Sequence, residues 1–331
     1  MKIATDNFRL VAKNLGRCCD LGTMRGFSAP LHPSDTIIKT ERPATSKRGR
    51  PLGRRNSSRG ALLDLPYSGS SPAALVLAWD KSIVRAAASM AGIAVPDEVY
   101  IRPNDDVWAA LPEKYPAFVK PCCADGSVGI TKDAIVHDRD EAARRVKAVQ
   151  AELPGGAIVV QEFLSGTEYG VGVIGNPDRG LTILPPLEVD YDALDPSLPR
   201  LLGFESKAMP GTPYWSDIRF REARLDAPRR ARVEAVAATM FERLGLRDYG
   251  RFDFRADAQG RIKFIECNPN PAWANDGKLA YMAGFAGIGY ADMLRMILEA
   301  AQLRAASERE SPNKRVSPIP GLAELSPPKR G

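Results

Sequence analysis

The most informative stretch of the sequence for the fold is GRFDFRADAQGRIKFIECNPNP, residues 250–271. Polar and apolar side chains alternate along it, which predicts two strands, 251–256 and 261–267. The residues between them, 257–260, predict a hairpin turn. Bulky apolar side chains share one face of the two strands, so we expect that face to be buried and the other to carry polar groups.

The polar face of this hairpin carries the groups best suited to chemistry. Alternation places Arg251, Asp253, Glu266 and Asn268 on it. A hairpin that closes symmetrically opposes Arg251 to Glu266 and Asp253 to Phe264. Carboxylate and amide oxygens suit Mg²⁺, which completes its shell with phosphate oxygens. A solvated hairpin with a surface Arg–Glu pair is the alternative that these residues alone leave open.

A second segment, FVKPCCADGSVGITK at 118–132, predicts a short strand followed by a glycine-rich loop. The loop residues 126–129 can bring backbone N–H groups close to phosphate oxygens, and Lys120 can direct its charge to the same place. The spacing is not that of a Walker phosphate loop. An ordinary turn is the alternative interpretation.

A third segment, IVVQEFLSGTEYGVGVI at 158–174, predicts strand, turn and strand. The main chain of 160–164 can offer hydrogen bonds to a flat purine. Glu168 can accept hydrogen bonds from ribose hydroxyls, although composition alone favours an ordinary surface carboxylate.

Helical patterns surround these strands. Gly92 and Gly245 each follow a predicted helix at the position where a helix commonly ends, and an apolar stripe runs along 228–244. The predicted helices are 80–91, 138–153, 228–244 and 290–303.

Composition excludes several classes of protein. The 331 residues carry a net charge of +6, but residues 1–59 contribute +9 and residues 300–331 contribute +3, which leaves 60–299 at −6. An acidic body with basic ends argues against a nucleic-acid groove on the folded domain. No apolar run approaches the ~20 residues of a membrane helix, and no secretory signal is evident.

The residue inventory narrows the chemistry further. Two histidines cannot supply a histidine-rich zinc site, and a Ser-His-Asp triad is equally improbable. Five cysteines without a C-x-x-C pair suit a reducing cytosol. The chemistry is therefore left to Lys, Arg, Asp, Glu, Asn and the backbone.

The order of the segments resembles that of the D-alanine–D-alanine ligases. The resemblance covers about 60–300, and the GRxD…ExN and VKP…GSVG pairs are typical of ATP-grasp enzymes. The matching segments are LPYSGSSPAALVLAWDKSIVR (65–85), FVKPCCADGSVG (118–129), VVQEFLSGTEY (159–169), ESKA (205–208), GRFDF (250–254) and IECNPNP (265–271).

The resemblance implies an α+β, ATP-grasp fold whose two subdomains grip ATP, with an incomplete N-terminal α/β lobe. The expected divisions are a poorly structured basic segment at 1–59, a remnant of the lobe at 60–80, an ATP-grasp domain at 81–303 with a small subdomain of about 115–165 and a C-terminal subdomain of about 166–303, and a disordered basic tail at 304–331.

The resemblance also implies a site and a reaction. A carboxylate attacks the γ-phosphate of ATP to give an acyl phosphate, and an amine then displaces phosphate to form an amide. The implied residues are Arg251, Lys207 and Ser127 for catalysis; Lys81, Lys120, Gln161, Glu162, Phe163, Leu164 and Glu168 for ATP; and Asp253, Glu266 and Asn268 for two Mg²⁺ ions, with Mn²⁺ as an alternative.

The family further implies a cytoplasmic enzyme of peptidoglycan biosynthesis, often a homodimer, whose partner is an amino acid or dipeptide rather than a nucleic acid or a membrane. The amino-acid half of the pattern departs from the family, however. The segment 1–59 lacks the lobe that carries a substrate-binding glutamate. The family's substrate-loop serine aligns with Gly126, and its ω-loop tyrosine aligns with Ala208.

Trp273 and Lys278 are unlike the family's usual occupants of the loop that meets the second amino acid. Lys278 is either a carboxylate ligand or an ordinary surface lysine. Two hypotheses follow. The chain is a carboxylate–amine ligase with its own choice of substrate, or it is a non-catalytic ATP-binding paralogue.

Overall fold

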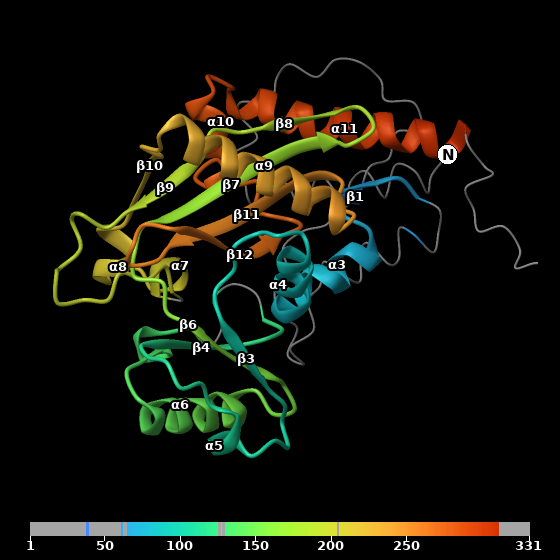
Figure 1. The fold of residues 1–331 in the computed structure, drawn as a ribbon. Helices are drawn as coiled ribbons and strands as arrows, with labels where there is room; N and C mark the ends of the chain where they lie inside the picture. Colours follow the sequence, from blue (N-terminus) through green and yellow to red (C-terminus); the bar gives the residue numbers. More distant parts are fainter. Residues whose placement is uncertain are drawn as a thin grey trace, which may run out of the picture.

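The computed structural model describes residues 38–39, 61, 65–124, 127, 130–203 and 205–310. Nearly all of 1–59 and all of 311–331 lie outside the described residues, so the predictions of unstructured ends fall mostly there. The described chain forms a six-stranded and a four-stranded β-sheet, both packed against helices, and a separate two-stranded pair (Figure 1).

The larger sheet has the strand order β10–β9–β7–β11–β12, with β8 paired to β7, and every pairing is antiparallel. Its central strands are long, and every residue of β11 is buried. The strands are β7 (Glu168–Asn176), β8 (Gly180–Ile183), β9 (Leu187–Asp190), β10 (Arg219–Glu222), β11 (Asp248–Ala256) and β12 (Ile262–Asn268).

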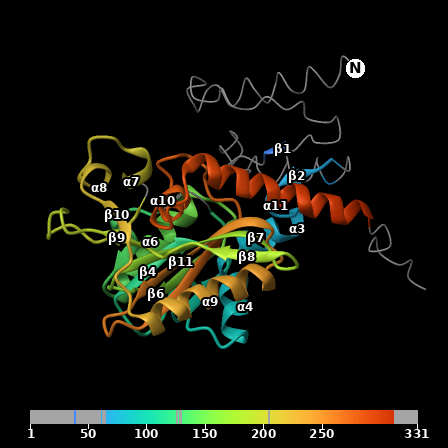
Figure 2. The ribbon, with the colours of Figure 1, turned by 90° about the horizontal axis from the view of Figure 1, so that it is seen from above.

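Helices cover both faces of this sheet. Helix α9 (Ala227–Arg243) lies on one face, while α10 (Lys278–Phe285) and α11 (Tyr290–Glu310) lie on the other (Figure 2). Each face has its own apolar core, in which Phe252 packs on the α9 side and Tyr249 on the α10–α11 side. Alternation along β11 therefore divides its side chains between two buried layers.

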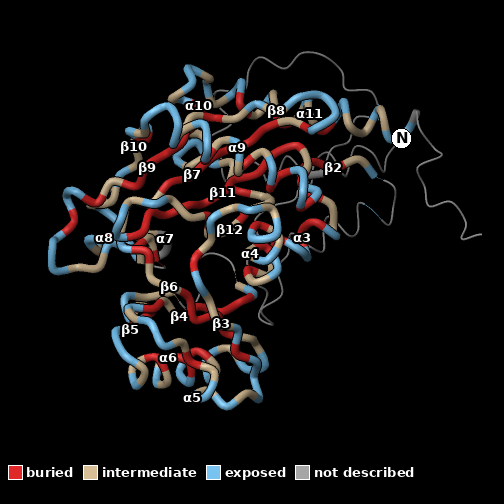
Figure 3. The backbone as a smooth tube through the Cα atoms, in the orientation of Figure 1, coloured by how far each residue is buried: buried red, intermediate tan, exposed pale blue. Residues whose placement is uncertain are grey.

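The smaller sheet has the order β3 (Glu98–Ile101), β6 (Ile158–Glu162), β4 (Ala117–Pro121) and β5 (Ile135–Val136). Helices α5 (Val107–Ala110) and α6 (Arg139–Glu152) cover the face that is remote from the larger sheet (Figure 1). The buried residues of this unit form a separate core (Figure 3). Because β3 belongs to this sheet, the small unit takes in residues that precede the expected boundary near 115.

Two short helices link the sheets. Helix α3 (Pro72–Trp79) begins after Ser71, whose side chain accepts the Ala74 N–H, and α4 (Lys81–Met90) begins after Asp80, whose carboxylate accepts the Ile83 N–H. Ser and Asp are favoured at this position because they satisfy backbone donors that the helix leaves unpaired.

The elements not yet placed are small. A two-residue strand, β1 (Ile38–Lys39), pairs in parallel with β2 (Tyr67–Ser68). The remaining pieces are η2 (Lys132–Ala134), α7 (Glu205–Ala208) and α8 (Pro213–Ser216). Within the part of the chain that is described, no helix has both the length and the apolar character of a membrane span.

The predicted register of the β11–β12 hairpin is wrong by two residues. Arg251 opposes Asn268 and Asp253 opposes Glu266, with a register shift after Asp253. The turn closes at Asp257 and Arg261, whose backbone N–H and C=O bond at 3.0 Å, rather than symmetrically. A three-residue turn and one bulged residue move the pairing by an even number, so the same side chains still share a face.

The last helix is also longer than predicted. It runs to Glu310 instead of ending near 303, so 304–310 are helical rather than part of a disordered tail. The cause is tertiary: Arg304 donates to both carboxylate oxygens of Asp248, at 2.9 and 3.0 Å, and to the Tyr67 carbonyl at 2.7 Å. These bonds hold a polar, weakly amphipathic segment against the sheet.

Candidate active site

The polar face of the β11–β12 hairpin is a compact cluster. Arg251 donates from Nε to Asp253 Oδ1 at 2.7 Å and from Nη2 to Asp253 Oδ2 at 2.9 Å. Asn268 donates from Nδ2 to Asp253 Oδ2 at 3.1 Å, which leaves its amide oxygen for another partner. Glu266 stands directly opposite Asp253. The structure thus brings Asp253, Glu266, Asn268 and Arg251 together.

The charge balance of this cluster follows from its burial. Arg251 and Asp253 are 7% and 8% exposed. Burial alone lowers the pKa of Arg251, but the Asp253 and Glu266 carboxylates outweigh it and raise the pKa overall. Arg251 therefore stays cationic, and it forms with Asp253 an ion pair that is largely shielded from solvent.

Two lysines from other elements face the same carboxylates. Lys81, at the start of α4, places Nζ 4.0 Å from Glu266 Oε2 and donates to the Ala124 carbonyl at 2.5 Å. Lys120, on β4, is 3% exposed and donates to Gln161 Oε1 at 3.0 Å. Burial lowers the pKa of Lys120 to about 8, although Glu266 partly opposes the shift. The small sheet therefore contributes a destabilised cation.

The end of β6 connects the two sheets. Gln161 is held between Lys120 and Glu98, to which its Nε2 donates at 2.9 Å. Glu162 accepts two bonds from Lys263 of β12, at 2.8 and 2.7 Å. The Glu162 side chain is thus engaged in joining the sheets, and its N–H donates to the Asp97 carbonyl at 2.8 Å, so the ligand role predicted from sequence would fall to its main-chain carbonyl.

Phe163 and Leu164 complete the predicted adenine-binding segment. The Phe163 ring stacks on Phe118, with centroids 6.3 Å apart, and the Arg255 guanidinium lies 5.3 Å from its centroid. Leu164 is 4% exposed. An aromatic ring beside a cation makes this segment a flat, partly apolar surface.

Glu168 is not an ordinary surface carboxylate. Its side chain is 14% exposed, and its Oε2 accepts from Tyr191 Oη at 2.9 Å and from Arg255 Nη1 at 3.4 Å. Burial, and then the nearby Glu168 charge, raise the pKa of Tyr191 well above 10. Tyr191 therefore stays protonated and donates to Glu168, which fixes the orientation of that carboxylate.

Lys278 is not a surface lysine either. It is the first residue of α10, and its Nζ lies 5.6 Å from the Phe220 ring centroid. Burial lowers the pKa of Lys278, with Asp253 opposing the shift and Arg251 reinforcing it. The ammonium therefore lies within electrostatic reach of the carboxylate cluster.

Two candidate catalytic residues are placed less completely. Ser127 has a φ of 62° and donates from Oγ to the Leu202 carbonyl at 3.4 Å, so the glycine-rich loop meets the segment that precedes α7. Lys207 belongs to α7. Its side chain lies outside the described part of the structure, as do the other residues of the glycine-rich loop.

Sequence reasoning missed Arg255, Lys263 and Tyr191. Arg255 had a visible signal, because it is the next residue after Arg251 and Asp253 on the same face of β11. Lys263 and Tyr191 had none, since each is defined by a partner from a distant segment.

Comparison with known proteins identifies the family to which the chain is similar. Residues 90–299, more than half of the chain, match the family model described as D-ala D-ala ligase C-terminus. A D-alanine–D-alanine ligase of Dechloromonas aromatica is 28% identical over 280 residues, 83% of this chain and 85% of the relative. That of Chlorobium phaeovibrioides is 28% identical over 246 residues, 72% of this chain but 63% of the relative.

Solved structures agree on the fold. The D-alanine–D-alanine ligase from Coxiella burnetii superposes with a TM-score of 0.61 at 19% identity, covering 77% of this chain and 65% of that one. The Bacillus anthracis enzyme complexed with ATP gives 0.59 at 22% identity, covering 76% and 75%.

Proposed function

Because this chain belongs to the D-alanine–D-alanine ligase family through its C-terminal domain and has the ATP-grasp fold of that family, we propose that it is an ATP-dependent carboxylate–amine ligase. The observation that carries the proposal is the gathering of Asp253, Glu266 and Asn268 on one face, across from Lys81 and Lys120. A solvated hairpin does not require two buried lysines beside its carboxylates.

The cluster fits divalent magnesium. Two carboxylates and an amide oxygen are hard ligands, and Asn268 already directs its nitrogen to Asp253, which leaves its oxygen for a cation. Asp253, Glu266 and Asn268 would hold the two Mg²⁺ ions, or Mn²⁺ in their place. The ions would supply neutralisation of the triphosphate charge.

We assign the remaining nucleotide contacts by position. Lys81, Lys120 and Lys207 receive the phosphates, the main chain of 161–164 receives the adenine, and Glu168 receives the ribose hydroxyls. Lys120 supports this assignment because a buried ammonium that donates to a neutral amide gains most from an incoming anion.

The chain's residues would act by positioning and by charge. The substrate carboxylate attacks the γ-phosphate, ADP leaves, and the amine then displaces inorganic phosphate from the acyl phosphate. Arg251, held by Asp253, presents its guanidinium to the oxyanion that forms in the second step.

Lys278 indicates the substrate class. The family's substrate serine and tyrosine are absent from Gly126 and Ala208, whereas the half-buried Lys278 ammonium lies within electrostatic reach of the carboxylate cluster. We therefore assign Lys278 to the carboxylate of an amino acid or dipeptide. The homodimer, the cytoplasmic setting and the place in peptidoglycan biosynthesis stay predictions.

Phosphate release from ATP and Mg²⁺ tests the proposal over a panel of D- and L-amino acids and dipeptides. Turnover with one of them, lost in Asp253→Asn and retained in the exposed loop variant Asp178→Asn, is the expected result. Tight Mg·ATP binding without turnover on the whole panel would instead establish the non-catalytic paralogue.

A further inference from the structure

A cluster of soft ligands lies beside the candidate active site and is not used by it. The Sγ atoms of Cys122 and Cys123 and a carboxylate oxygen of Asp80 all lie within 4.8 Å of one another. Cys122 Sγ donates to Asp80 Oδ1 at 3.2 Å, and Cys123 Sγ lies 3.9 Å from Asp80 Oδ2. Neither cysteine is in a disulfide.

These separations match those in a tetrahedral metal site. Zn–S bonds of about 2.3 Å and Zn–O bonds of about 2.0–2.2 Å place the ligand atoms of such a site roughly 3.3–3.8 Å apart. The observed Sγ–O separations of 3.2 and 3.9 Å, to different Asp80 oxygens, lie just below and just above that range, and the two Sγ atoms lie within 4.8 Å of each other. A cation at the centre would therefore need only small side-chain movements.

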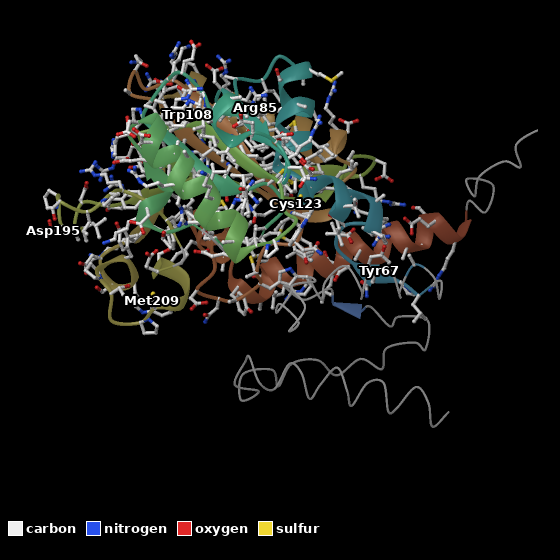
Figure 4. The ribbon with its side chains drawn as sticks, turned by 90° about the horizontal axis from the view of Figure 1, so that it is seen from below. Tyr67, Arg85, Trp108, Cys123, Asp195 and Met209 are labelled. Atoms are coloured by element: carbon white, nitrogen blue, oxygen red, sulfur yellow. The ribbon has the colours of Figure 1, made fainter. Side chains whose placement is uncertain are left out.

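Hydrogen bonds hold two of the three ligands, Cys122 and Asp80, in place. The Cys122 N–H donates to the Ala157 carbonyl at 2.9 Å, and its carbonyl accepts the Lys81 N–H at 3.3 Å. Asp80 is fixed as the N-cap of α4. Cys122 is buried, whereas Cys123 is exposed and lies on the face seen from below in Figure 4, so solvent ions can reach the cluster.

We propose that Cys122, Cys123 and Asp80 form a binding site for a thiophilic divalent cation such as Zn²⁺ or Cd²⁺, with water as the fourth ligand. Two thiolates favour soft ions over Mg²⁺, so this site is chemically distinct from the oxygen cluster of Asp253 and Glu266. On binding, each thiol loses its proton to solvent and forms a bond to the metal.

The site lies next to two of the lysines assigned to the phosphates, Lys81 and Lys120. Asp80 precedes Lys81, and Lys120 lies two residues before Cys122. A bound cation would therefore tie the start of α4 to the end of β4, two elements that position these ammonium groups. This consequence does not depend on the identity of the ligase substrate.

Cadmium titration of the full-length protein tests the site. Cys18 and Cys19 form a second vicinal pair, so the background is Cys18→Ser/Cys19→Ser. We expect one Cd²⁺ per chain by calorimetry, with an ultraviolet thiolate-to-cadmium charge-transfer band, in the presence of excess Mg²⁺. Cys267 is 6% exposed in the hairpin core and should not contribute.

Three variants in this background decide the assignment. Cys123→Ser, an exposed change, should weaken Cd²⁺ binding by more than about 100-fold, since loss of an outer-shell partner alone costs roughly 10–100-fold. Asp80→Asn keeps a capping oxygen and should weaken binding by about 10-fold. Asp138→Asn, at the matched N-cap of α6, should leave the affinity unchanged.

Equal affinity in the background, Cys123→Ser and Asp80→Asn proteins would overturn the proposal, and so would absence of the charge-transfer band in the background. A loss of affinity in Asp138→Asn equal to that in Asp80→Asn would do the same, because the effect would then come from helix capping.

Discussion

The two sheets differ in whether their buried charged side chains are bonded to a partner of opposite charge. On the large sheet, each buried charge has a charged partner: Arg251 bonds Asp253 twice, and Glu168 accepts from Arg255. On the small sheet, Lys120 donates to a neutral amide, and burial lowers its pKa. Paired charges are stable as they stand, whereas a lysine without a bonded carboxylate gains stability from an incoming anion.

The contrast indicates a division of labour. The large sheet holds a preformed cluster, and under the proposed function the small sheet carries a cation whose desolvation a bound phosphate would offset. Variants that remove one charged group from each sheet test this difference.

The largest effect is expected at Arg251. Arg251→Met should lower kcat by roughly 10²–10³-fold, because one donor to a developing oxyanion contributes that much. Steady-state phosphate release with a turned-over substrate measures it. Arg251→Lys keeps the charge but loses the two-point contact with Asp253, so it should recover only part of the rate. An unchanged kcat in Arg251→Met would remove Arg251 from the reaction.

Lys120 should give a pH-dependent stability. The pKa of Lys120 in the folded protein is about 8, below its ordinary value of 10.5. Between these two pH values the unfolded chain binds more protons than the folded one. The free energy of unfolding therefore rises with pH across this window, by up to about 3 kcal/mol. Urea unfolding at pH 7.5 and 9.5 measures the rise. Lys120→Met should lose most of it, whereas the exposed control Lys147→Met should retain it.

The affinity for nucleotide should also depend on the protonation of Lys120, but it should fall with pH where the stability rises. As pH rises through about 8, Lys120 loses its proton and its attraction for phosphate, so the affinity for Mg·ATP should fall. Calorimetry of Mg·ATP at the two pH values, with Lys120→Met as reference, checks this. A pH-independent affinity in the unmodified protein would contradict the proposed role of Lys120 in attracting the phosphates.

Lys278 should give a smaller and more selective effect. Lys278→Met should raise the KM of the amino-acid substrate by about 10-fold, which corresponds to a charged contact of about 1.4 kcal/mol, and leave the KM of ATP unchanged. Initial-rate kinetics at varied concentrations of each substrate separate the two. Equal changes in both constants would indicate a general disturbance of α10.

The smallest effect is expected at the ion pair between the sheets. Glu162→Gln loses the contact with Lys263, but the Glu162 side chain is 31% exposed. The free energy of unfolding should therefore fall by less than about 1 kcal/mol. Urea unfolding measures this change, and a loss of several kcal/mol would show that the sheets depend on this pair.

The sequence predicted those parts of the site that depend on local pattern. Alternation alone put Arg251, Asp253, Glu266 and Asn268 on one face, and the structure brings them together. Their exact pairing was beyond reach, because a three-residue turn and a bulge set the register and neither has a strong composition signal. Because the predicted register differs from the observed one by two residues, the four side chains stay on the same face and the predicted cluster is unchanged.

Features that depend on distant packing were not predictable. The burial of Lys278 comes from α10, a helix that the periodicity did not reveal. The cysteine pair was visible at 122–123, but its third ligand, Asp80, comes from the start of another helix. The charges and partners of Glu168 and Lys120 likewise became clear only when separate strands were placed side by side.

The buried carboxylate of Asp248 has a consequence for the way the molecule opens. It is fully buried and accepts from Gly69, Asn176 and Arg304, which belong to an early loop, a central strand and the last helix. Backbone amides near residue 69 and in the last helix, far apart along the chain, should therefore exchange with deuterium at similar rates. We expect the loop near residue 69 to have the same local stability as the last helix.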